Sequence, residues 1–202
     1  MSNRGLDIDA AEYEQHFAEQ QVPYSNALHS VVRARGPYMV GPMARFNLNF
    51  ARLPEIAKQT AHDCGLELPC RNPFRSIVVR AVELVFACHE ALRIIREYEP
   101  PAVPRVEALP RAGTGQAATE APRGLLYHRY ALDKNGLVTL AKIVPPTSQN
   151  QKQIENDLWR FVGQVATRPV REITWKCEQA VRNYDPCISC ATHFLRLHVE
   201  RE

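Results

Sequence analysis

The feature that most limits what this chain can fold into is a long helical pattern in its middle. Apolar residues recur at steps of three and four positions through residues 74–95, which places them on one face of a helix. Pro73 suits the first turn of that helix, and Pro100 and Pro101 end it. A helix this long normally belongs to a bundle, so its apolar face needs helical partners.

Weaker patterns predict the elements on either side of this helix. Residues 9–21 and 43–62 have helical character, and Pro54 interrupts the second of these segments. Residues 99–119 are rich in Pro, Gly, Ala and Thr, and we expect them to form a connector.

Two β-prone runs follow the connector and flank an Asn-Gly turn. Residues 125–132 and 137–144 are these runs, and their arrangement predicts a β-hairpin. Residues 151–166 and 169–184 then predict two more helices, the second of which begins at Pro169. The expected fold class is therefore mainly α (α+β): long helices of a bundle with one β-hairpin.

The composition excludes several classes of protein. With 202 residues, of which 45% are hydrophobic and 23% charged, the chain has enough apolar material for a folded core. A net charge of +3 gives no argument for nucleic acid, and charged residues interrupt the apolar stretch at residues 77–95, so we expect no membrane span. We also see no secretory signal, which predicts a cytoplasmic protein whose cysteines serve metal binding or catalysis rather than disulfides.

The strongest local signal is the stretch DPCISCATH near the C-terminus. Cys187 and Cys190 are three residues apart, so both thiolates can ligate one metal ion, and His193 follows three residues later. The spacing does not fit haem attachment, because alanine rather than histidine follows the second cysteine. Two alternatives stay open: half of a zinc site completed by Cys177 or His198, and a pair of reduced thiols that bind no metal.

A second signal, ATEAPRG, lies just before the first run of the hairpin. Arg123 stands between Pro122 and Gly124, and these neighbours restrict its backbone so that the planar guanidinium can be aimed at one point. The alternative is an ordinary ion pair, for which Glu120 is the nearest candidate partner.

A third signal, IVPPTSQN, follows the second run of the hairpin. Its simplest interpretation is a strand end stiffened by Pro145 and Pro146, with Thr147 or Ser148 capping the next helix.

Together these stretches, with RGPYMVGPMARFNLNF and RNPFRSIVVRAVEL, resemble one protein family. The resemblance is to the C-terminal portion of the large (alpha) subunit of nickel–iron hydrogenases, and to its cytoplasmic NAD-reducing-like branch. It begins at about GLDIDAAEYE and continues to the end, so residues 1–202 are expected to be a single C-terminal portion of that subunit.

The resemblance implies a metal site built on two cysteines. Cys187 corresponds to a terminal thiolate on nickel, and Cys190 to a thiolate that bridges nickel and iron. The iron is expected to carry cyanide and carbonyl ligands. Arg123 is expected to lie over the open side of the metal pair. Because a guanidinium resists deprotonation, we expect Cys187 to accept the proton of dihydrogen and Arg123 to act through its charge.

Further residues are implied to surround this centre. Pro122 and Pro145 or Pro146 correspond to the apolar wall of the pocket for the diatomic ligands, and Thr147 to a donor toward a cyanide. His193 corresponds to the ligand of a nearby magnesium ion, or of iron in its place.

The sequence departs from the family pattern in two ways. The family's centre takes two more thiolates from an N-terminal motif, Arg-x-Cys-Gly-x-Cys, which does not occur here; Cys64 and Cys70 lack its spacing. Residues 194–202 follow the motif histidine, where a maturation protease removes a short peptide in the family, so we expect a cleavable extension and an unprocessed precursor.

The expected function is therefore a hydrogenase large-subunit segment that contributes half of the metal site for reversible heterolytic cleavage of dihydrogen, and that is inactive alone. Its implied partners are the N-terminal half of the large subunit or a chain supplying it, an iron–sulfur small subunit and a diaphorase-type module. The alternative is a noncatalytic metal-binding or assembly module. A complex-I-type subunit is disfavoured, because Cys187, Cys190 and Arg123 are all present.

Overall fold

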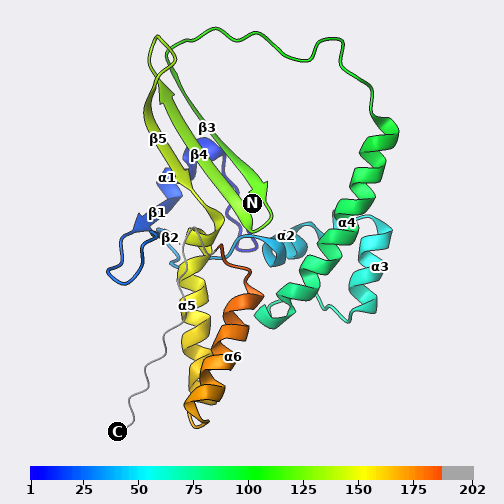
Figure 1. Ribbon diagram of the computed structural model, residues 1–202, viewed down its shortest axis with the longest axis vertical. Helices are drawn as coiled ribbons and strands as arrows, with labels where there is room; N and C mark the ends of the chain where they lie inside the picture. Colours follow the sequence, from blue (N-terminus) through cyan, green and yellow to red (C-terminus); the bar gives the residue numbers. More distant parts are fainter. Residues whose placement is uncertain (188–202) are drawn as a thin grey trace.

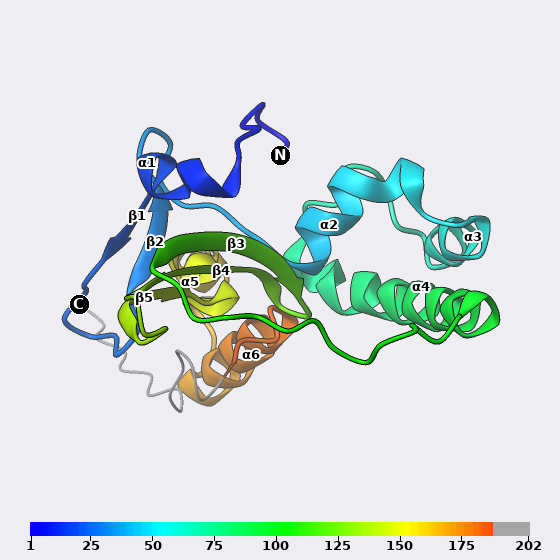
Figure 2. The ribbon, with the colours of Figure 1, turned by 90° about the horizontal axis from the view of Figure 1, so that it is seen from above.

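A computed structural model of the chain describes residues 1–187. It contains helices and two antiparallel sheets, which confirms the expected α+β class (Figure 1). Two groups of elements are visible from above: α2, α3 and α4 lie together on one side, and the sheets with α5 and α6 lie on the other (Figure 2). The candidate site residues lie where these two groups meet.

The N-terminal segment differs from the predicted helix. A 3-10 turn at Ala10–Glu12 and α1 at Tyr13–His16 occupy its first half, but Phe17–Gln20 forms strand β1. This strand pairs antiparallel with β2, His29–Val32. The rings of Tyr13 and Phe17 stack 4.5 Å apart, so packing and strand pairing override the local helix propensity here.

The predicted break at Pro54 is confirmed. Helix α2 spans Pro42–Asn49, a 3-10 turn spans Phe50–Arg52, and α3 begins at Glu55 directly after Pro54 and ends at Asp63. Both helices pack on α4, Ser76–Glu97. The buried residues of these three helices form one core cluster with Cys70, which lies between α3 and α4: Met43, Phe46, Ala57, Ala61, Cys70, Val79 and Val82.

The long helix is also confirmed, but only its first half is covered. Val79 and Val82 are buried, whereas Leu84, Leu92 and Ile95 on the predicted apolar face are 68%, 52% and 72% exposed. The described elements therefore do not supply the bundle partners that this face needs.

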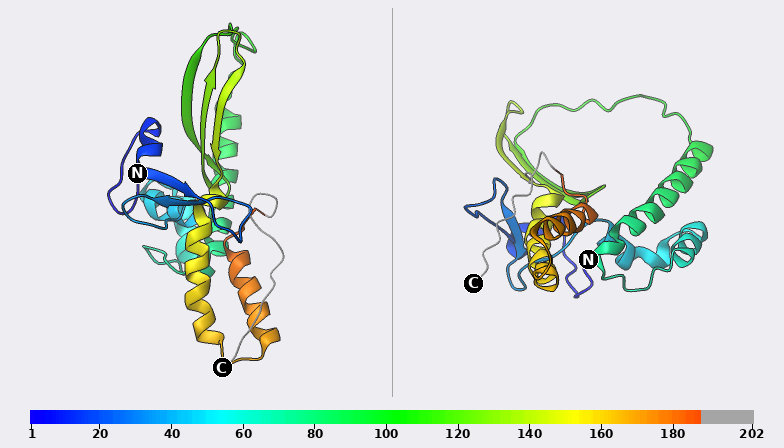
Figure 3. Two further views of the ribbon diagram at one scale, coloured as in Figure 1. Left: turned by 90° about the vertical axis from the view of Figure 1, so that its left-hand side faces the viewer. Right: turned by 60° about the horizontal axis from the view of Figure 1, so that its bottom comes forward.

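The predicted hairpin is part of a sheet with one more strand. In the described residues the order is β3-β4-β5, with β3 at Gly113–Ala121, β4 at Gly124–Leu132 and β5 at Val138–Val144. Strand β3 begins inside the expected connector and continues two residues past its end, so the connector ends at residue 112 instead of 119. Its Gly and Ala residues have little β-propensity, and pairing along β4 is what makes the segment a strand. The shortened connector arches from α4 to this sheet (Figures 1 and 3).

Two antiparallel helices complete the described chain. Helix α5, Pro146–Val165, starts five residues before the predicted 151, and α6 spans Val170–Asn183 as expected. Helix α5 packs against both β2 and α6. Within residues 1–187, none of the helices is both long and apolar enough to cross a membrane.

Candidate metal centre

Arg123 lies at the tip of the hairpin that joins β3 to β4. Ala121 pairs with Gly124, so Pro122 and Arg123 form a two-residue turn. Gly124 has φ +139°, a conformation that residues with a side chain rarely adopt. The sequence therefore folds locally as predicted, with Arg123 restricted by a proline before it and a glycine after it.

The chain before α2 passes against this turn. A Cβ built on Gly41 would lie 2.5 Å from the carbonyl oxygen of Arg123, and one built on Gly124 would lie 2.8 Å from the Gly41 nitrogen. Neither position has room for a methyl group. The two glycines thus allow the backbones of residues 40–41 and 123–124 to touch.

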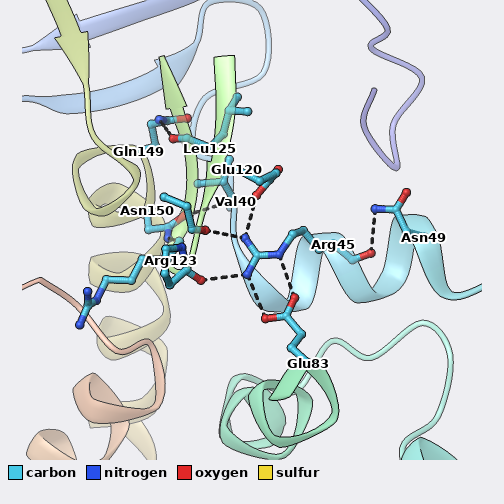
Figure 4. A network of polar contacts seen from close by, with 11 residues as sticks. Val40, Arg45, Asn49, Glu83, Glu120, Arg123, Leu125, Gln149 and Asn150 are labelled. Carbon is cyan, nitrogen blue, oxygen red and sulfur yellow. Dashed lines mark hydrogen bonds and ion pairs between the residues drawn. The ribbon is translucent and has the colours of Figure 1, made fainter. Parts of the chain in front are cut away.

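Arg45 of α2 holds the turn from one side (Figure 4). Its Nη1 donates to the carbonyl oxygen of Ala121 at 2.9 Å, and its Nη2 to that of Pro122 at 2.8 Å. The guanidinium also binds Glu83 of α4 and Glu120 of β3. Burial would lower the pKa of Arg45, but the hydrogen bonds that it donates to these two carboxylates raise it above its ordinary value.

The first turn of α5 holds the same region from the other side. Pro145 precedes the helix and Pro146 occupies its first position, so Thr147 and Ser148 are helical residues and neither is the cap. This overturns the capping interpretation. The turn presents three buried polar side chains that contact other segments: Thr147, Gln149 and Asn150.

Gln149 and Asn150 bind backbone groups of three regions: strands β4 and β5, the turn at Arg123, and the chain before α2. Gln149 Nε2 donates to the carbonyl oxygens of Leu125 and Val144, at 2.5 and 3.1 Å. Asn150 Oδ1 accepts from the N–H of Val40 at 2.8 Å, and its Nδ2 donates to the Arg123 carbonyl at 3.5 Å. The polar groups of this buried turn are thus used to fix neighbouring backbones.

The DPC segment after α6 meets both motifs. Arg123 Nε donates to the carbonyl oxygen of Asp185 at 2.7 Å and lies 3.3 Å from its carboxylate. Arg80 of α4 also pairs with Asp185, at 3.3 Å. Two residues later, the N–H of Cys187 donates to Thr147 Oγ1 at 3.2 Å. Asp185 has φ +49°, and this turn in the backbone directs the chain toward α5.

These contacts show whether Arg123 forms an ion pair, which was one of the alternatives raised from the sequence. Arg123 is indeed ion-paired, but its partner is Asp185 rather than Glu120, which binds Arg45 instead. The side chain of Arg123 is 41% exposed, so the pair lies at an accessible edge.

The structure brings the sequence motifs together, as far as it describes them. Arg123 and Thr147 are both in contact with the 185–187 segment. Cys190, His193 and the 194–202 extension lie outside the described residues. Sequence reasoning gave no role to Arg45 or Asp185, although both stand inside the motifs that carry the resemblance. Their partners are 38 or more residues away in sequence, and no local pattern reveals such pairs.

The donor set fits a metal centre only in part. Within residues 1–187, no three His, Cys, Asp or Glu side chains cluster as metal ligands. Cys177, considered as a zinc ligand, packs with Val165 and Ile173 in the core between α5 and α6, where burial raises the pKa of its thiol. Two thiolates at 187 and 190 suit soft or borderline metals such as nickel and iron, but they leave a coordination sphere that needs ligands from elsewhere.

Comparisons with known proteins agree with one another. The family model described as "Nickel-dependent hydrogenase" matches residues 33–193. Sulfhydrogenase 1 subunit alpha of Pyrococcus furiosus is 32% identical over 195 residues, which cover 96% of this chain and 45% of the relative. The HoxS subunit beta of the NAD-reducing hydrogenase of Cupriavidus necator is 29% identical over 209 residues, which cover 94% of this chain and 41% of that subunit.

Solved structures show the same fold. An NAD+-reducing NiFe hydrogenase in the H2-reduced state superposes with a TM-score of 0.79 at 24% identity, covering 92% of this chain and 43% of that one. A NiFeSe hydrogenase of Dm. baculatum gives a TM-score of 0.61 at 22% identity, covering 93% and 46%. The chain thus spans less than half the length of these relatives. It belongs to the nickel-dependent hydrogenase family and corresponds to part of the large subunit.

Proposed function

We propose that this chain contributes part of a nickel–iron centre for the reversible heterolytic cleavage of dihydrogen. The observation that carries the proposal is that the 185–187 segment contacts Arg123 on one side and Thr147 on the other. These three stretches are far apart in sequence, and the fold joins them around the first cysteine of the CxxC motif.

In this proposal Cys187 and Cys190 hold the metals. The bound pair, with cyanide and carbonyl on its iron, supplies a Lewis acid for the hydride. The protein must then supply a base for the proton, and we assign this to Sγ of Cys187. The N–H of Cys187 is fixed by Thr147, so the backbone that carries this thiolate is anchored to a helix rather than to a loop.

Thr147 is suited to a second contact at the same time. A hydroxyl has one donor hydrogen and two acceptor lone pairs. Its oxygen accepts from Cys187, which leaves its hydrogen available to a cyanide on the iron. Pro122, Pro145 and Pro146 add no N–H donors of their own, which suits an apolar wall beside the diatomic ligands.

Arg123 acts in this proposal through its position and charge. Its guanidinium stays protonated and is held at Asp185, two residues from the thiolate. Arg80 shares the same carboxylate, so the CxxC segment begins between two cations.

The rest of the coordination sphere is assigned to a partner. Four thiolates are needed, and the printed sequence contains one CxxC and no Arg-x-Cys-Gly-x-Cys. We assign the other two to the N-terminal half of the large subunit or a chain supplying it. An iron–sulfur small subunit would take the electrons. One relative is a subunit of an NAD-reducing hydrogenase, which supports an NAD-linked partner. We assign this role to a diaphorase-type module and the complex to the cytoplasm. His193 would bind magnesium, or iron in its place, and a maturation protease would act at 194–202.

Metal analysis after co-expression with a chain that carries Arg-x-Cys-Gly-x-Cys tests the proposal. We expect nickel and iron near one each per complex, with infrared bands of cyanide and carbonyl. Cys187→Ser should lose the nickel, whereas the same change at the exposed Cys64 should not. Absence of nickel from the wild-type complex would overturn the proposal.

A second candidate is a noncatalytic metal-binding or assembly module. Such a module would keep the fold and the two cysteines of the CxxC motif without completing a nickel–iron centre. This alternative predicts zinc alone, bound through Cys187 and Cys190, in the same metal analysis.

A further inference from the structure

The guanidinium of Arg45 uses every N–H it has. Nε and Nη2 bind the two carboxylate oxygens of Glu83, at 2.8 and 2.9 Å. The second hydrogen of Nη2 goes to the carbonyl oxygen of Pro122 at 2.8 Å. Nη1 binds Glu120 at 2.7 Å and the carbonyl oxygen of Ala121 at 2.9 Å. A guanidinium has five N–H donors, and each of them has its own acceptor here.

The two edges of this guanidinium serve different purposes. The edge toward Glu83 joins α2 to α4, as a bidentate ion pair commonly does. The opposite edge faces the backbone of the hairpin turn and binds two successive carbonyls, those of Ala121 and Pro122. The ion pair between α2 and α4 does not depend on the hydrogen bonds to these two carbonyls.

Asn150 completes the hold from the other side of the turn. Its Nδ2 reaches the carbonyl of Arg123, so the three successive carbonyls of residues 121–123 all accept from side chains of other elements. Figure 4 shows the turn between these donors, with the side chain of Arg123 directed away from Arg45. The direction of that side chain follows from a backbone that is held at each peptide.

We propose that Arg45 is a positioning residue for Arg123, acting through the carbonyls of Ala121 and Pro122. The importance of Arg123 rests on the proposed function above. The coupling between the two arginines is a separate property of the folded chain, and it is measurable without metal or dihydrogen.

The test substitutes Arg45→Lys in the full 15N-labelled chain. Lysine keeps the charge and an ion pair with Glu83, but an ammonium group lacks the planar fork that spans two carbonyls. We expect hydrogen exchange of the Arg123 Nε–H, identified by its loss in Arg123→Lys, to be at least tenfold faster, together with that of the backbone amides of Ala121 and residues 123–125. The amides of Val79 and Val82 in the buried part of α4 should exchange as in the wild type.

Two controls separate positioning from general stability. Glu83→Gln removes the charge of the interhelical pair but leaves Arg45 in place, and Arg93→Lys makes the same substitution at an exposed arginine of α4. Both should leave the Arg123 Nε–H protected. Unchanged exchange in Arg45→Lys, or equal loss in Glu83→Gln, overturns the proposal.

A further variant keeps the test decisive if Arg45→Lys does not fold. Glu120→Gln replaces a half-exposed carboxylate with a neutral amide and so weakens the ion pair that directs Nη1 of Arg45 toward Ala121. It should accelerate exchange in residues 121–125 by a smaller factor, about two- to fivefold, and leave α4 unaffected. No acceleration there contradicts the proposal, whatever the metal analysis of the assembled complex shows.

Discussion

At Gly41 and Gly124, two backbone segments approach so closely that a methyl group fits at neither residue. Both glycines also have positive φ, +102° and +139°. The space and the conformation therefore select glycine independently at each position. The contact sets the distance between α2, which carries Arg45, and the turn that carries Arg123.

Replacing Gly41 by alanine tests this contact. The new Cβ would lie 2.5 Å from the Arg123 carbonyl oxygen, so we expect a loss of roughly 2–4 kcal/mol from strain and overpacking. Gly65→Ala is the matched control, because Gly65 has φ +63° and nothing within 4 Å of the built Cβ; it should lose about 1 kcal/mol. Urea denaturation of the two variants compares them, and equal losses would show that crowding at Gly41 is unimportant.

Arg123→Lys addresses the proposed role of the guanidinium. Lysine keeps the positive charge near Asp185 but cannot reproduce the planar fork. In the complex assembled with its partner, we expect dihydrogen turnover to fall roughly tenfold or more, equivalent to about 1.4 kcal/mol of barrier. Arg182→Lys on the exposed part of α6 is the control and should retain full turnover. Undiminished turnover in Arg123→Lys would mean that positioning by the fork is unnecessary.

Single residues of the site were predictable where a local motif restricts them. Arg123 and Thr147 stand beside prolines, and the cysteine spacing at 187 and 190 is itself informative. Arg45 and Asp185 were not, because their importance comes from partners brought close only by the fold. The capping interpretation of Thr147 failed for a local reason: Pro146 occupies the first helical position, so the helix has already started before Thr147.

At the scale of elements, the apolar face that the sequence predicts for α4 is longer than the surface that α2 and α3 cover. Its apolar positions continue to residue 95, but α2 and α3 cover only the first half of the helix. The exposed part carries Leu84, Leu92 and Ile95. An exposed apolar surface of this kind is typical of an interaction site, and the chain spans less than half the length of its relatives.

The contact between β2 and α5 contains a histidine that titrates differently in the folded protein. His29 is fully buried, and its Nε2 lies 3.4 Å from Glu155 Oε1 of α5. Burial lowers the pKa of His29, opposed by the carboxylate of Glu155 and supported by the charge of Lys152. The folded protein therefore binds fewer protons at this residue than the unfolded chain does.

The sign of the pH dependence follows from that lowered pKa. An unfolded histidine takes up its proton near pH 6.5, so the stabilisation is complete above that pH and is lost as the pH falls toward the folded pKa. We expect the urea midpoint to decrease between pH 7.5 and 5.5, and less steeply in His29→Gln. His62→Gln, at an exposed histidine of α3, should keep the wild-type slope. Identical slopes in all three proteins would exclude His29 as the cause.

Elements with a strong period were predictable, and those that depend on tertiary pairing were not. The helices α4 and α6 and the β4–β5 hairpin agree with the sequence pattern. Strand β3 was not found, because its pairing with β4 rather than its composition determines it. For the same reason Phe17–Gln20 is a strand despite the helical character of its sequence.

At the scale of the whole molecule, two stretches of chain join the two groups of elements: residues 33–41, which lead from β2 to α2, and the exposed connector, which leads from α4 to β3. Residues 98–112 have neither helix nor strand, and all of them are exposed. The groups are also held together by contacts at the site, such as Arg45 to Glu120 and Arg80 to Asp185, and by the rings of Phe74 and Phe161. The same contacts that build the candidate site therefore also connect the two halves of the fold.

Limited trypsin digestion tests this arrangement. Among the residues that the structure describes, we expect the first cuts after Arg105 and Arg111, because an exposed connector adapts to a protease more readily than a helix does. The two fragments should remain together on gel filtration, because β2 in the first packs against α5 in the second and Tyr13 packs with Tyr127, in addition to the contacts across the site. Arg105→Gln with Arg111→Gln should remove these cuts, and earlier cleavage within α4 would contradict the described fold.

The first turn of α5 has a consequence for what insertions this chain can accept. Thr147, Gln149 and Asn150 each contact a different segment, and their directions depend on their order around the helix. One residue added between Pro146 and Thr147 would rotate all three side chains by about 100° and shift them by about 1.5 Å. Three contacts would then be lost in a single step with every amino acid still present, so the length of this segment is under the same constraint as its composition.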